Sequence, residues 1–353
     1  MASRPPGSSP TISIVVSTYN SAELLRACLG QLSRQSAIGE CEVLVIDSGS
    51  EQNEAAVCTA FQTEFPALLY ERTPRETVYS AWNRALTKAR GRYFVNANTD
   101  DSLHPHALSL LKRALDRYPE AVIAYGDWIW SNTPNASFPV DPSCPHIRHE
   151  AYHPSIPLTY CYTGCTQFWR TEKLRQLGGF RSQRWAAADY EALTDIVRRR
   201  WAAAYVPTPV AAHYKNPAGL SLASNRSFQE FCEIRNALRA QVPISAIYDV
   251  DEADATACAA GWVGLAQRAL HVYAPWAAGP DPDFDYATFA AQQALTRDPS
   301  SRPAKRLLKA LARKQHTLWD KLLRRRLDRI RGMALSRVPE PPPRVKPLVA
   351  AIE

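Results

Sequence analysis

Two carboxylates and an amide stand together directly after a short apolar run. Asn98, Thr99, Asp100 and Asp101 follow Tyr93–Ala97, whose composition is typical of a buried strand. Hard cations such as Mg²⁺ and Mn²⁺ take oxygen ligands and usually complete their shell with substrate phosphates. The spacing therefore suits a cation that neutralises a diphosphate leaving group. The same residues also suit a plain solvated turn, so the surrounding elements must decide between the two interpretations.

Predicted strands and helices alternate along the first third of the chain. Strands are predicted at 11–16, 41–46, 68–72, 93–97 and 121–125. The helical spacing of apolar residues predicts helices at 21–33, 54–63, 76–89 and 106–117. These strands are largely apolar rather than alternating, which is the pattern of a parallel sheet covered on both faces. We therefore expect an α/β fold.

Polar residues follow four of the predicted strands, at the point where each strand ends. They are Ser17–Asn20, Asp47–Ser50, Asn98–Asp101 and Gly126–Asp127. Ligands of open α/β sheets bind outside the carboxyl ends of the strands. We therefore expect these polar groups to converge on one edge of the sheet and to form a binding site there.

Four short motifs, in this order, resemble glycosyltransferase family 2. They are Ile14–Asn20, Val43–Ser50, Ser80–Arg84 followed by Ala89–Gly91, and Asn96–Asp101. Each motif is weak alone, but four in order at family-like spacing are specific. The resemblance covers about residues 11–225 and implies a GT-A fold, a Rossmann-like and mostly parallel sheet with helices on both faces. It also implies an inverting, nucleotide-sugar-dependent transfer.

The resemblance implies a donor site at the strand ends. The loop from Ser17 to Asn20 would line the base and ribose, with Tyr19 beside the base, and Asp47 would hydrogen-bond the base edge. Asp100 and Asp101 would meet the metal and the diphosphate. The donor contacts implied in this way are Ser17, Thr18, Tyr19, Asn20, Asp47, Ser50, Asn83, Arg84, Asn98 and Thr99.

Position 98 departs from the metal signature of the family, which is Asp-x-Asp. Asn98 offers a carbonyl oxygen but no charge, so we expect weaker binding of Mn²⁺ or Mg²⁺, with Asp100 as the principal anchor and Asp101 in support. His213 lies in a loop predicted after a later strand, and several GT-A enzymes use a late histidine as a metal or diphosphate ligand. His213 is therefore a third candidate ligand, although an ordinary loop histidine explains it equally well.

The segment Ala186–Glu191 resembles the second acidic motif of the family, whose acidic residue deprotonates the acceptor. A single displacement needs a base on the face opposite the leaving diphosphate. Asp189 is the predicted base and Glu191 the reserve; alternatively, Asp189 only caps the helix predicted at 189–200. By the same analogy the acceptor would meet Asp127, Trp128, Gln167, Trp169 and Glu191.

The charged residues are unevenly distributed along the chain. The formal net charge is +8, yet 302–337 alone hold 13 Lys or Arg against two Asp or Glu. The body is therefore not evenly basic, which argues against a nucleic-acid partner. We predict a disordered N-terminus at 1–10, a catalytic domain at 11–225, a helical region at 226–301, a basic amphipathic helix at 302–337 and a Pro-rich tail at 338–353.

The basic helix predicted at 302–337 would lie on an anionic membrane surface or pack on the body with its charges in water. The chain has no apolar run long enough to span a bilayer. Its eight cysteines are scattered without a CxxC pair, which fits free thiols in a reducing cytosol. We therefore expect a cytoplasmic protein, peripheral to the inner face of the membrane if the basic helix binds there.

Together these features predict a glycosyltransferase that moves a sugar from a nucleotide diphosphate, of the UDP type before GDP or dTDP, onto a saccharide or lipid-linked saccharide hydroxyl in surface polysaccharide assembly. One rival is a non-catalytic nucleotide-sugar-binding or scaffolding module, which Asn98 makes conceivable. A second rival is a nucleotidyltransferase, but its glycine-rich phosphate loop after the first strand is missing from this sequence.

Overall fold

The computed structural model describes residues 9–221, 225–271, 283–313 and 348–349. The described residues form two compact units, one of residues 9–152, 161–221, 225–234 and 348–349 and the other of residues 153–160, 235–271 and 283–313. Nearly all of the predicted N-terminal segment 1–10 and Pro-rich tail 338–353 lies outside the described residues, as does the predicted basic helix beyond residue 313.

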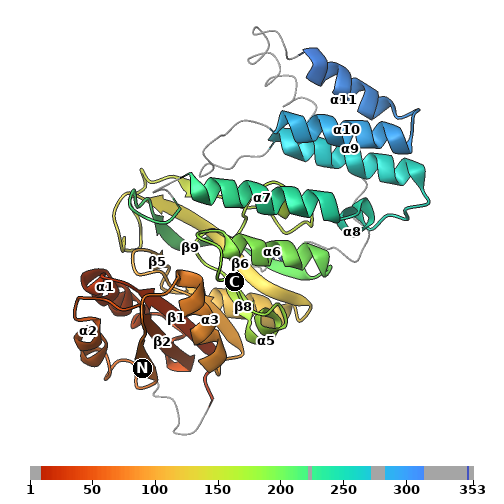
Figure 1. The fold of residues 1–353 in the computed structure, drawn as a ribbon. Helices are drawn as coiled ribbons and strands as arrows, with labels where there is room; N and C mark the ends of the chain where they lie inside the picture. Colours follow the sequence, from red (N-terminus) through yellow and green to blue (C-terminus); the bar gives the residue numbers. More distant parts are fainter. Residues whose placement is uncertain (1–8, 222–224, 272–282, 314–347, 350–353) are drawn as a thin grey trace. The chain divides into compact units, whose positions relative to one another are not determined.

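The first unit is built on a ten-stranded mixed sheet (Figure 1) in the order β10-β9-β6-β8-β4-β1-β2-β3, with β5 paired to β9 and β7 paired to β6. The strands are β1 Ile12–Thr18, β2 Cys41–Asp47, β3 Leu68–Arg72, β4 Tyr93–Asn96, β5 Ser102–Leu103, β6 Ala121–Ser131, β7 His146–Ile147, β8 Phe168–Arg170, β9 Ala202–Tyr214 and β10 Leu348–Val349. β3, β2, β1 and β4 are parallel, whereas β8 runs antiparallel to both β4 and β6. The mostly parallel α/β sheet predicted from the sequence is confirmed.

Helices cover this sheet with their apolar sides. They are α1 Ala22–Leu32, α2 Glu54–Ala60, α3 Val78–Lys88, α4 Ala107–Arg117, α5 Thr171–Gln176 and α6 Ala188–Arg198, with a short 3₁₀ turn at Ile38–Glu40. The first half of α7 Arg226–Gln241 belongs to this unit and packs on Ala187 and Tyr190, whereas a second 3₁₀ turn, Ile156–Leu158, belongs to the other unit. α3 shows why they form: the Thr77 side chain accepts a hydrogen bond from the Ser80 N–H at its start, and Tyr79, Trp82 and Leu86 follow at helical spacing on its buried side. α3 packs on β1 and β2, and α4 packs on β6 and β9.

β6 and β9 are longer than predicted. They pair in parallel from Ala121 to Ser131, with register shifts on both sides of Asp127 that let the ladder continue past an irregularity. Gly126 is needed there because a Cβ atom would lie 2.7 Å from the Val210 Cγ1 atom. The prediction that Gly126–Asp127 ends a strand is therefore wrong, and so is the prediction that His213 lies in a loop.

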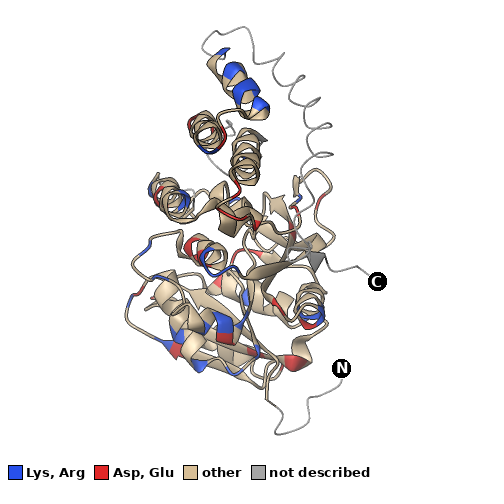
Figure 2. Cartoon of the chain, turned by 90° about the vertical axis from the view of Figure 1, so that its right-hand side faces the viewer, with Lys and Arg blue, Asp and Glu red and all other residues tan. Residues whose placement is uncertain are grey.

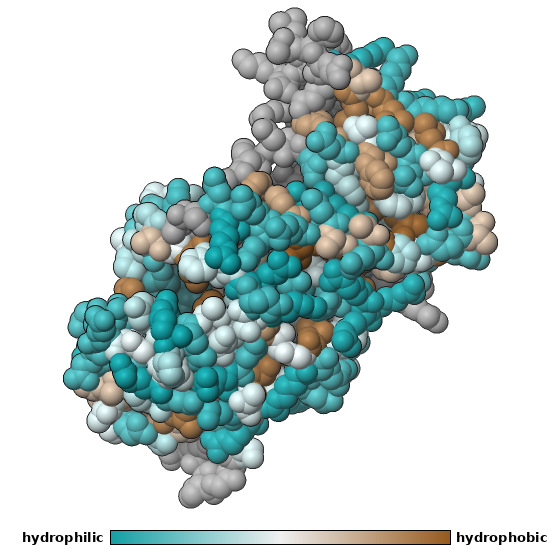
Figure 3. Space-filling model, in the orientation of Figure 1, coloured by the Kyte–Doolittle hydropathy of each residue, from teal (hydrophilic) through white to brown (hydrophobic). Residues whose placement is uncertain are grey.

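The second unit is helical. It contains α8 Ile244–Tyr248, α9 Ala255–His271, α10 Phe284–Arg297 and α11 Arg302–Ala312. Small residues let the helices approach closely, since Ala259, Ala294 and Ala304 form one buried cluster with Val263. The ribbon of α11 is coloured at several Lys and Arg positions in Figure 2, and Figure 3 shows apolar residues among polar ones on this unit. None of the helices in the described ranges is both long and apolar enough to cross a membrane.

Candidate active site

The loops after β1 and β2 are cross-linked, as the strand-end argument predicts. The Asn20 N–H donates to the Ser50 Oγ atom at 3.0 Å, and the Glu51 N–H donates to the Asn20 Oδ1 atom at 2.7 Å. Asn20 has a left-handed backbone with φ 47°, a conformation that asparagine tolerates better than most residues. The two loops therefore form one braced edge next to the strand ends.

Asp47 lies at the end of β2 and is 1% exposed. Its Oδ1 atom accepts the Ser50 N–H at 2.8 Å, and its Oδ2 atom accepts the Tyr70 hydroxyl at 2.6 Å. A base that hydrogen-bonds Asp47, as the sequence analysis predicts, would have to take the place of the Tyr70 hydroxyl.

Tyr19 is the large exposed side chain of the first loop. Its ring is 43% exposed, and the Arg75 guanidinium lies 3.6 Å from the ring centroid. By contrast, Ser17 is engaged with the core, where its Oγ atom accepts the Trp82 indole N–H at 3.2 Å. The sequence analysis did not find Arg75, because it belongs to the segment after β3 and no motif marks it.

Asn83 and Arg84 are hydrogen-bonded to other parts of the protein. The Asn83 amide donates to the Phe180 carbonyl at 2.6 Å and accepts the Phe180 N–H at 2.8 Å, so both of its polar atoms hold one backbone turn. Arg84 donates two hydrogen bonds to Glu76. Both residues thus have structural partners, and their contacts with a nucleotide sugar stay a prediction.

The acidic turn after β4 is held in place by its neighbours. Asn98 donates to the Asp101 Oδ2 atom at 2.7 Å, and Asn216 donates to the Asp100 Oδ2 atom at 2.9 Å. From a separate loop, the Asn135 side chain donates to the Thr99 carbonyl at 2.9 Å. Asn98 thus orients a carboxylate, and the turn is an organised feature rather than a solvated connection.

Asp101 and His213 form an ion pair. The His213 Nδ1 atom lies 2.9 Å from the Asp101 Oδ1 atom, which also accepts the Tyr214 N–H at 2.8 Å. Burial opposes charge on both groups, but their mutual attraction and hydrogen bond raise the pKa of His213 well above its ordinary value. The same interactions, with the bonds from Asn98 and Tyr214, hold the pKa of Asp101 below its ordinary value.

Asp100 has the opposite electrostatic environment. Burial, and then the charge of Asp101, raise the pKa of the Asp100 carboxyl. Donor atoms of Asp101, Cys165 and His213 all lie within 4.8 Å of one another, which is close enough for one metal ion. A carboxylate, an imidazole and a thiol are all known metal-ligating groups, so the residues fit a divalent cation. The cluster is centred on Asp101, whereas the sequence analysis made Asp100 the principal anchor.

Asp189 lies in the first turn of α6 and is partly exposed. Its Oδ1 atom accepts the Tyr79 hydroxyl at 3.0 Å and the Tyr190 N–H at 2.8 Å. Burial raises the pKa of Asp189 despite these hydrogen bonds, and the charge of His213 acts in the opposite direction.

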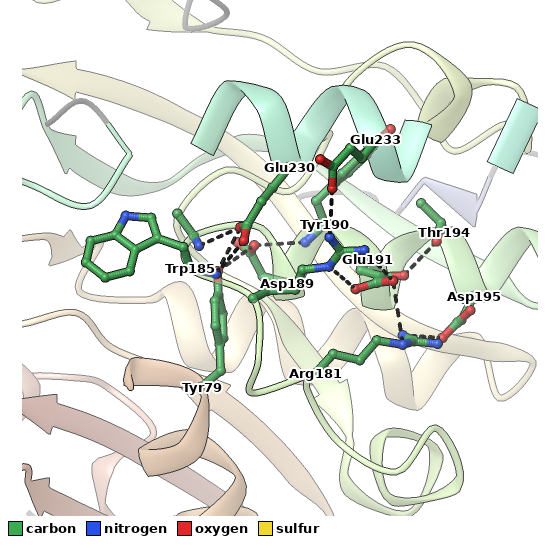
Figure 4. Close-up of polar contacts among 12 residues, drawn as sticks. Tyr79, Arg181, Trp185, Asp189, Tyr190, Glu191, Thr194, Asp195, Glu230 and Glu233 are labelled. Atoms are coloured by element: carbon green, nitrogen blue, oxygen red, sulfur yellow. Dashed lines mark hydrogen bonds and ion pairs between the residues drawn. The ribbon is translucent and has the colours of Figure 1, made fainter. Parts of the chain in front are cut away.

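The segment before Asp189 is held by α7. Figure 4 shows Glu230 reaching it from above and Tyr79 reaching Asp189 from below. The buried Glu230 carboxylate accepts the Trp185 N–H at 2.7 Å and the Ala186 N–H at 3.0 Å. Trp185 itself is 38% exposed. The sequence analysis did not find Tyr79 or Glu230, because neither belongs to the acidic motif that they support.

Several residues predicted to meet the acceptor are occupied elsewhere. Glu191 pairs with Arg184 at 2.9 Å and with Arg181 at 3.6 Å, so it is poorly placed as a reserve base. Trp169 is fully buried in β8 and donates to the Gln167 Oε1 atom at 3.0 Å. The acceptor role of these three residues stays a prediction, which their burial and partners do not favour.

Asp127 and Trp128 are also covered in this structure. The Asp127 carboxylate accepts the Tyr205 hydroxyl at 2.6 Å and the His149 N–H at 2.9 Å, and it pairs with His146 at 3.0 Å. The Trp128 ring packs edge-on to His213 with 5.5 Å between their centroids. Asp127 joins neighbouring segments of the sheet and Trp128 packs against a candidate metal ligand, and the acceptor role of both residues stays a prediction.

Comparison with known proteins identifies a family. The model of Glycosyl transferase family 2 matches residues 13–177, a region that contains the loops after β1, β2 and β4 but ends before Asp189 and His213. A PGL/p-HBAD biosynthesis glycosyltransferase of Mycobacterium tuberculosis is 29% identical over 126 residues, which are 35% of this chain and 49% of the relative. The chain therefore matches only about half the length of that relative.

Two further relatives and one solved structure extend the comparison. The chondroitin synthase of Pasteurella multocida is 29% identical over 101 residues, which are 29% of this chain and 10% of the relative. The glycosyltransferase YfnE of Bacillus subtilis is 32% identical over 88 residues, which are 25% of this chain and 22% of the relative. S. aureus TarS 1-349 in complex with UDP-GlcNAc has a TM-score of 0.56 at 15% identity and covers 87% of this chain and 93% of that one. That likeness supports the GT-A fold.

Proposed function

We propose that this chain, which belongs to glycosyltransferase family 2, transfers a sugar from a nucleotide diphosphate of the UDP type to a hydroxyl of a saccharide or lipid-linked saccharide, with inversion. One observation carries the proposal. The acidic turn of the matched region stands beside His213, whose Nδ1 atom lies 2.9 Å from the Asp101 carboxylate, and donor atoms of Asp101, Cys165 and His213 lie within 4.8 Å of one another. A site with a cation-binding side and a carboxylate base suits a direct displacement at a sugar carbon.

The donor would lie along the loops that follow β1, β2 and β4. Tyr19 offers the base an exposed ring, and Asp47 offers a carboxylate oxygen once the Tyr70 hydroxyl has moved. Asp101 and His213, with Asp100 beside them, would hold a divalent cation such as Mn²⁺ or Mg²⁺. When bound, that cation would supply positive charge to the leaving diphosphate.

Asp189 would receive the proton of the acceptor hydroxyl. Tyr79 and Tyr190 both donate to its Oδ1 atom, so Oδ2 would be the atom that accepts the proton. The raised pKa that burial gives Asp189 brings the base closer to neutral pH, where proton acceptance is more effective. Because no protein nucleophile takes part in this scheme, the sugar passes directly to the acceptor and its configuration inverts.

The names of the relatives support one class of acceptor. The mycobacterial relatives are named for PGL/p-HBAD biosynthesis, and those of Pasteurella multocida are a chondroitin synthase and a hyaluronan synthase. We therefore favour a saccharide or lipid-linked saccharide and a role in surface polysaccharide assembly. The exposed ring of Trp185, directly before the acidic segment, is available to stack on a sugar of the acceptor.

The test begins with the donor. A thermal-shift screen of UDP-, GDP- and dTDP-sugars, each with and without Mn²⁺, should raise the Tm most with one donor class, because a ligand that binds the native state stabilises it. Transfer is then measured with that donor in Asp101→Asn, Asp189→Asn and, as a matched control on an exposed loop, Asp141→Asn. We expect Asp189→Asn to lose about 10²–10⁴-fold in rate. Full turnover in both Asp101→Asn and Asp189→Asn would refute the assigned roles.

The proposal includes an anionic membrane surface as a partner of residues 302–337. The described start of this segment, α11, carries Arg302, Lys305, Arg306 and Lys309, and each cation near anionic lipid contributes up to about 1 kcal/mol. Sedimentation with anionic vesicles compares the full chain with a chain ending at residue 299. Binding should fall with the truncation and with added salt. Equal binding by both chains would exclude this segment as the membrane contact.

A further inference from the structure

We propose that Cys165 is a third protein ligand of the cation held by Asp101 and His213, and that this site consequently selects zinc-like ions over Mg²⁺. The inference rests on the proposed function in so far as that function places a cation at Asp101. Its test does not require turnover. The thiol is absent from the donor motifs quoted from the sequence, and it reaches the site from a different part of the chain.

The three donor atoms are already gathered. Those of Asp101, Cys165 and His213 lie within 4.8 Å of one another. An ion with bonds of about 2.0–2.3 Å in tetrahedral geometry holds its ligands about 3.5 Å apart. Small side-chain movements would therefore close the cluster around one ion. In the protein without a metal, the His213 ring instead hydrogen-bonds both the Asp101 carboxylate and the Cys165 side chain.

The backbone of Cys165 is fixed by the strand that leads into the acidic turn. The Asn96 side chain, at the end of β4, donates to the Cys165 carbonyl at 2.9 Å and accepts the Gln167 N–H at 3.2 Å. Gly164, just before the cysteine, has φ +59°, and a Cβ atom there would lie 2.4 Å from the Trp128 Nε1 atom. This left-handed and crowded turn sets the position from which the thiol meets Asp101.

His213 is positioned from the opposite side. Its ring packs edge-on to Trp128 at 5.5 Å and to Trp130 at 6.1 Å between centroids. Trp128 therefore contacts both His213 and the turn that carries Cys165. One indole thus sets the spacing between the sulfur and the imidazole, as expected of a residue that orients metal ligands from behind.

The chemistry of the set decides which ion it prefers. Mg²⁺ takes oxygen ligands in near-octahedral geometry, whereas a thiolate favours zinc and other thiophilic ions. A carboxylate, an imidazole and a thiolate leave one position of a tetrahedral zinc or cobalt ion open, which is the pattern of zinc sites that bind a substrate. A phosphate oxygen of the donor is the chemical match for that open position.

Cobalt provides the test, because Co²⁺ bound by a thiolate shows a sulfur-to-metal charge-transfer band in the near ultraviolet. The full-length protein is titrated with Co²⁺, and the variants are Cys165→Ser, Asp101→Asn and, as a matched control at another partly exposed cysteine, Cys144→Ser. We expect one equivalent of the band in the wild type and in Cys144→Ser, and none in Cys165→Ser. Competition with Zn²⁺ should show affinity lower by about 100-fold or more in Cys165→Ser, since losing groups behind a ligand already costs 10–100-fold.

The outcomes separate this inference from the proposed function. A Cys165→Ser protein that keeps the band, or a wild type that binds Co²⁺ without the band, overturns the inference and leaves the glycosyl transfer assay to judge the function. Loss of the band in Asp101→Asn supports the shared site, and does so even if Cys165→Ser fails to fold. Stronger binding of Mg²⁺ than of Zn²⁺ by the wild type would also overturn it.

Discussion

Replacing Tyr79 with phenylalanine removes one hydroxyl from the proposed base and leaves the aromatic ring in place. The hydroxyl donates to the Asp189 Oδ1 atom at 3.0 Å, and the ring packs edge-on to Trp82 with 5.3 Å between centroids. Tyr79 is 3% exposed, so water cannot readily replace the lost donor. The variant therefore tests one hydrogen bond with little change in packing.

The direction of the expected change in rate follows from the protonation state of Asp189 that catalysis needs. A base acts only when ionised, so activity is lost as the pH falls through the pKa of Asp189, which burial already raises. The Tyr79 hydroxyl stabilises the ionised form, and its removal raises that pKa further. A hydrogen bond to a charged group contributes about 1.5–3 kcal/mol. At 1.36 kcal/mol per factor of ten, the acidic-side rate should fall about 10- to 150-fold, with little loss at alkaline pH.

The assay is the pH dependence of kcat/KM for transfer, measured with the donor identified by thermal shift. Tyr93→Phe is the matched control, because it removes a hydroxyl from a different carboxylate, Asp116. The acidic limb should move to higher pH in Tyr79→Phe and stay in place in Tyr93→Phe. A loss in Tyr79→Phe that is the same at every pH would show that Tyr79 acts on the fold rather than on the base, and the reasoning would be wrong.

Three further substitutions have expected outcomes. Asp189→Asn should raise the Tm by a few degrees at neutral pH but not at acidic pH, because a carboxyl whose pKa is raised in the folded state destabilises the protein once ionised. A Tm that is unchanged at both pH values would contradict the burial of the Asp189 carboxyl. Gly164→Ala should cost about 1–3 kcal/mol in urea unfolding, because the new Cβ atom overlaps Trp128. Asn83→Ala should cost about 1–3 kcal/mol by leaving the Phe180 backbone unpaired, and a selective rise of the donor KM would instead place Asn83 in the donor site.

The fold was predictable where local patterns and tertiary structure agree. β1 and β2 are largely apolar and are buried along almost their whole length, as expected of parallel strands covered on both faces. β6 and β9 were predicted too short because each continues through residues that usually end a strand, such as Gly126 and Pro209. The pairing of β6 with β9 continues because its register shifts at these residues. Such shifts depend on the partner strand and have no signature in a single sequence.

The site was predictable to the same extent. Asp101 follows a buried strand, so its place at the sheet edge could be derived from chain order. Cys165, Glu230 and Tyr79 could not be found in this way, because each acts through contact with a segment far away in sequence. Trp169 was predicted to meet the acceptor because an aromatic side chain can stack on a sugar, but an aromatic side chain can equally pack in the core. Trp169 is fully buried, and burial is a property that the sequence alone does not show.

The three-residue strand β8 has a consequence for how the protein is made. It joins β4 to β6 at the middle of the sheet, yet it is synthesised only after both of them. Until Phe168–Arg170 leaves the ribosome, the facing sides of β4 and β6 lack their native partner, and unpaired strand edges promote association between chains. The growing polypeptide thus passes through a vulnerable interval, and fragments cut before residue 168 should aggregate rather than fold.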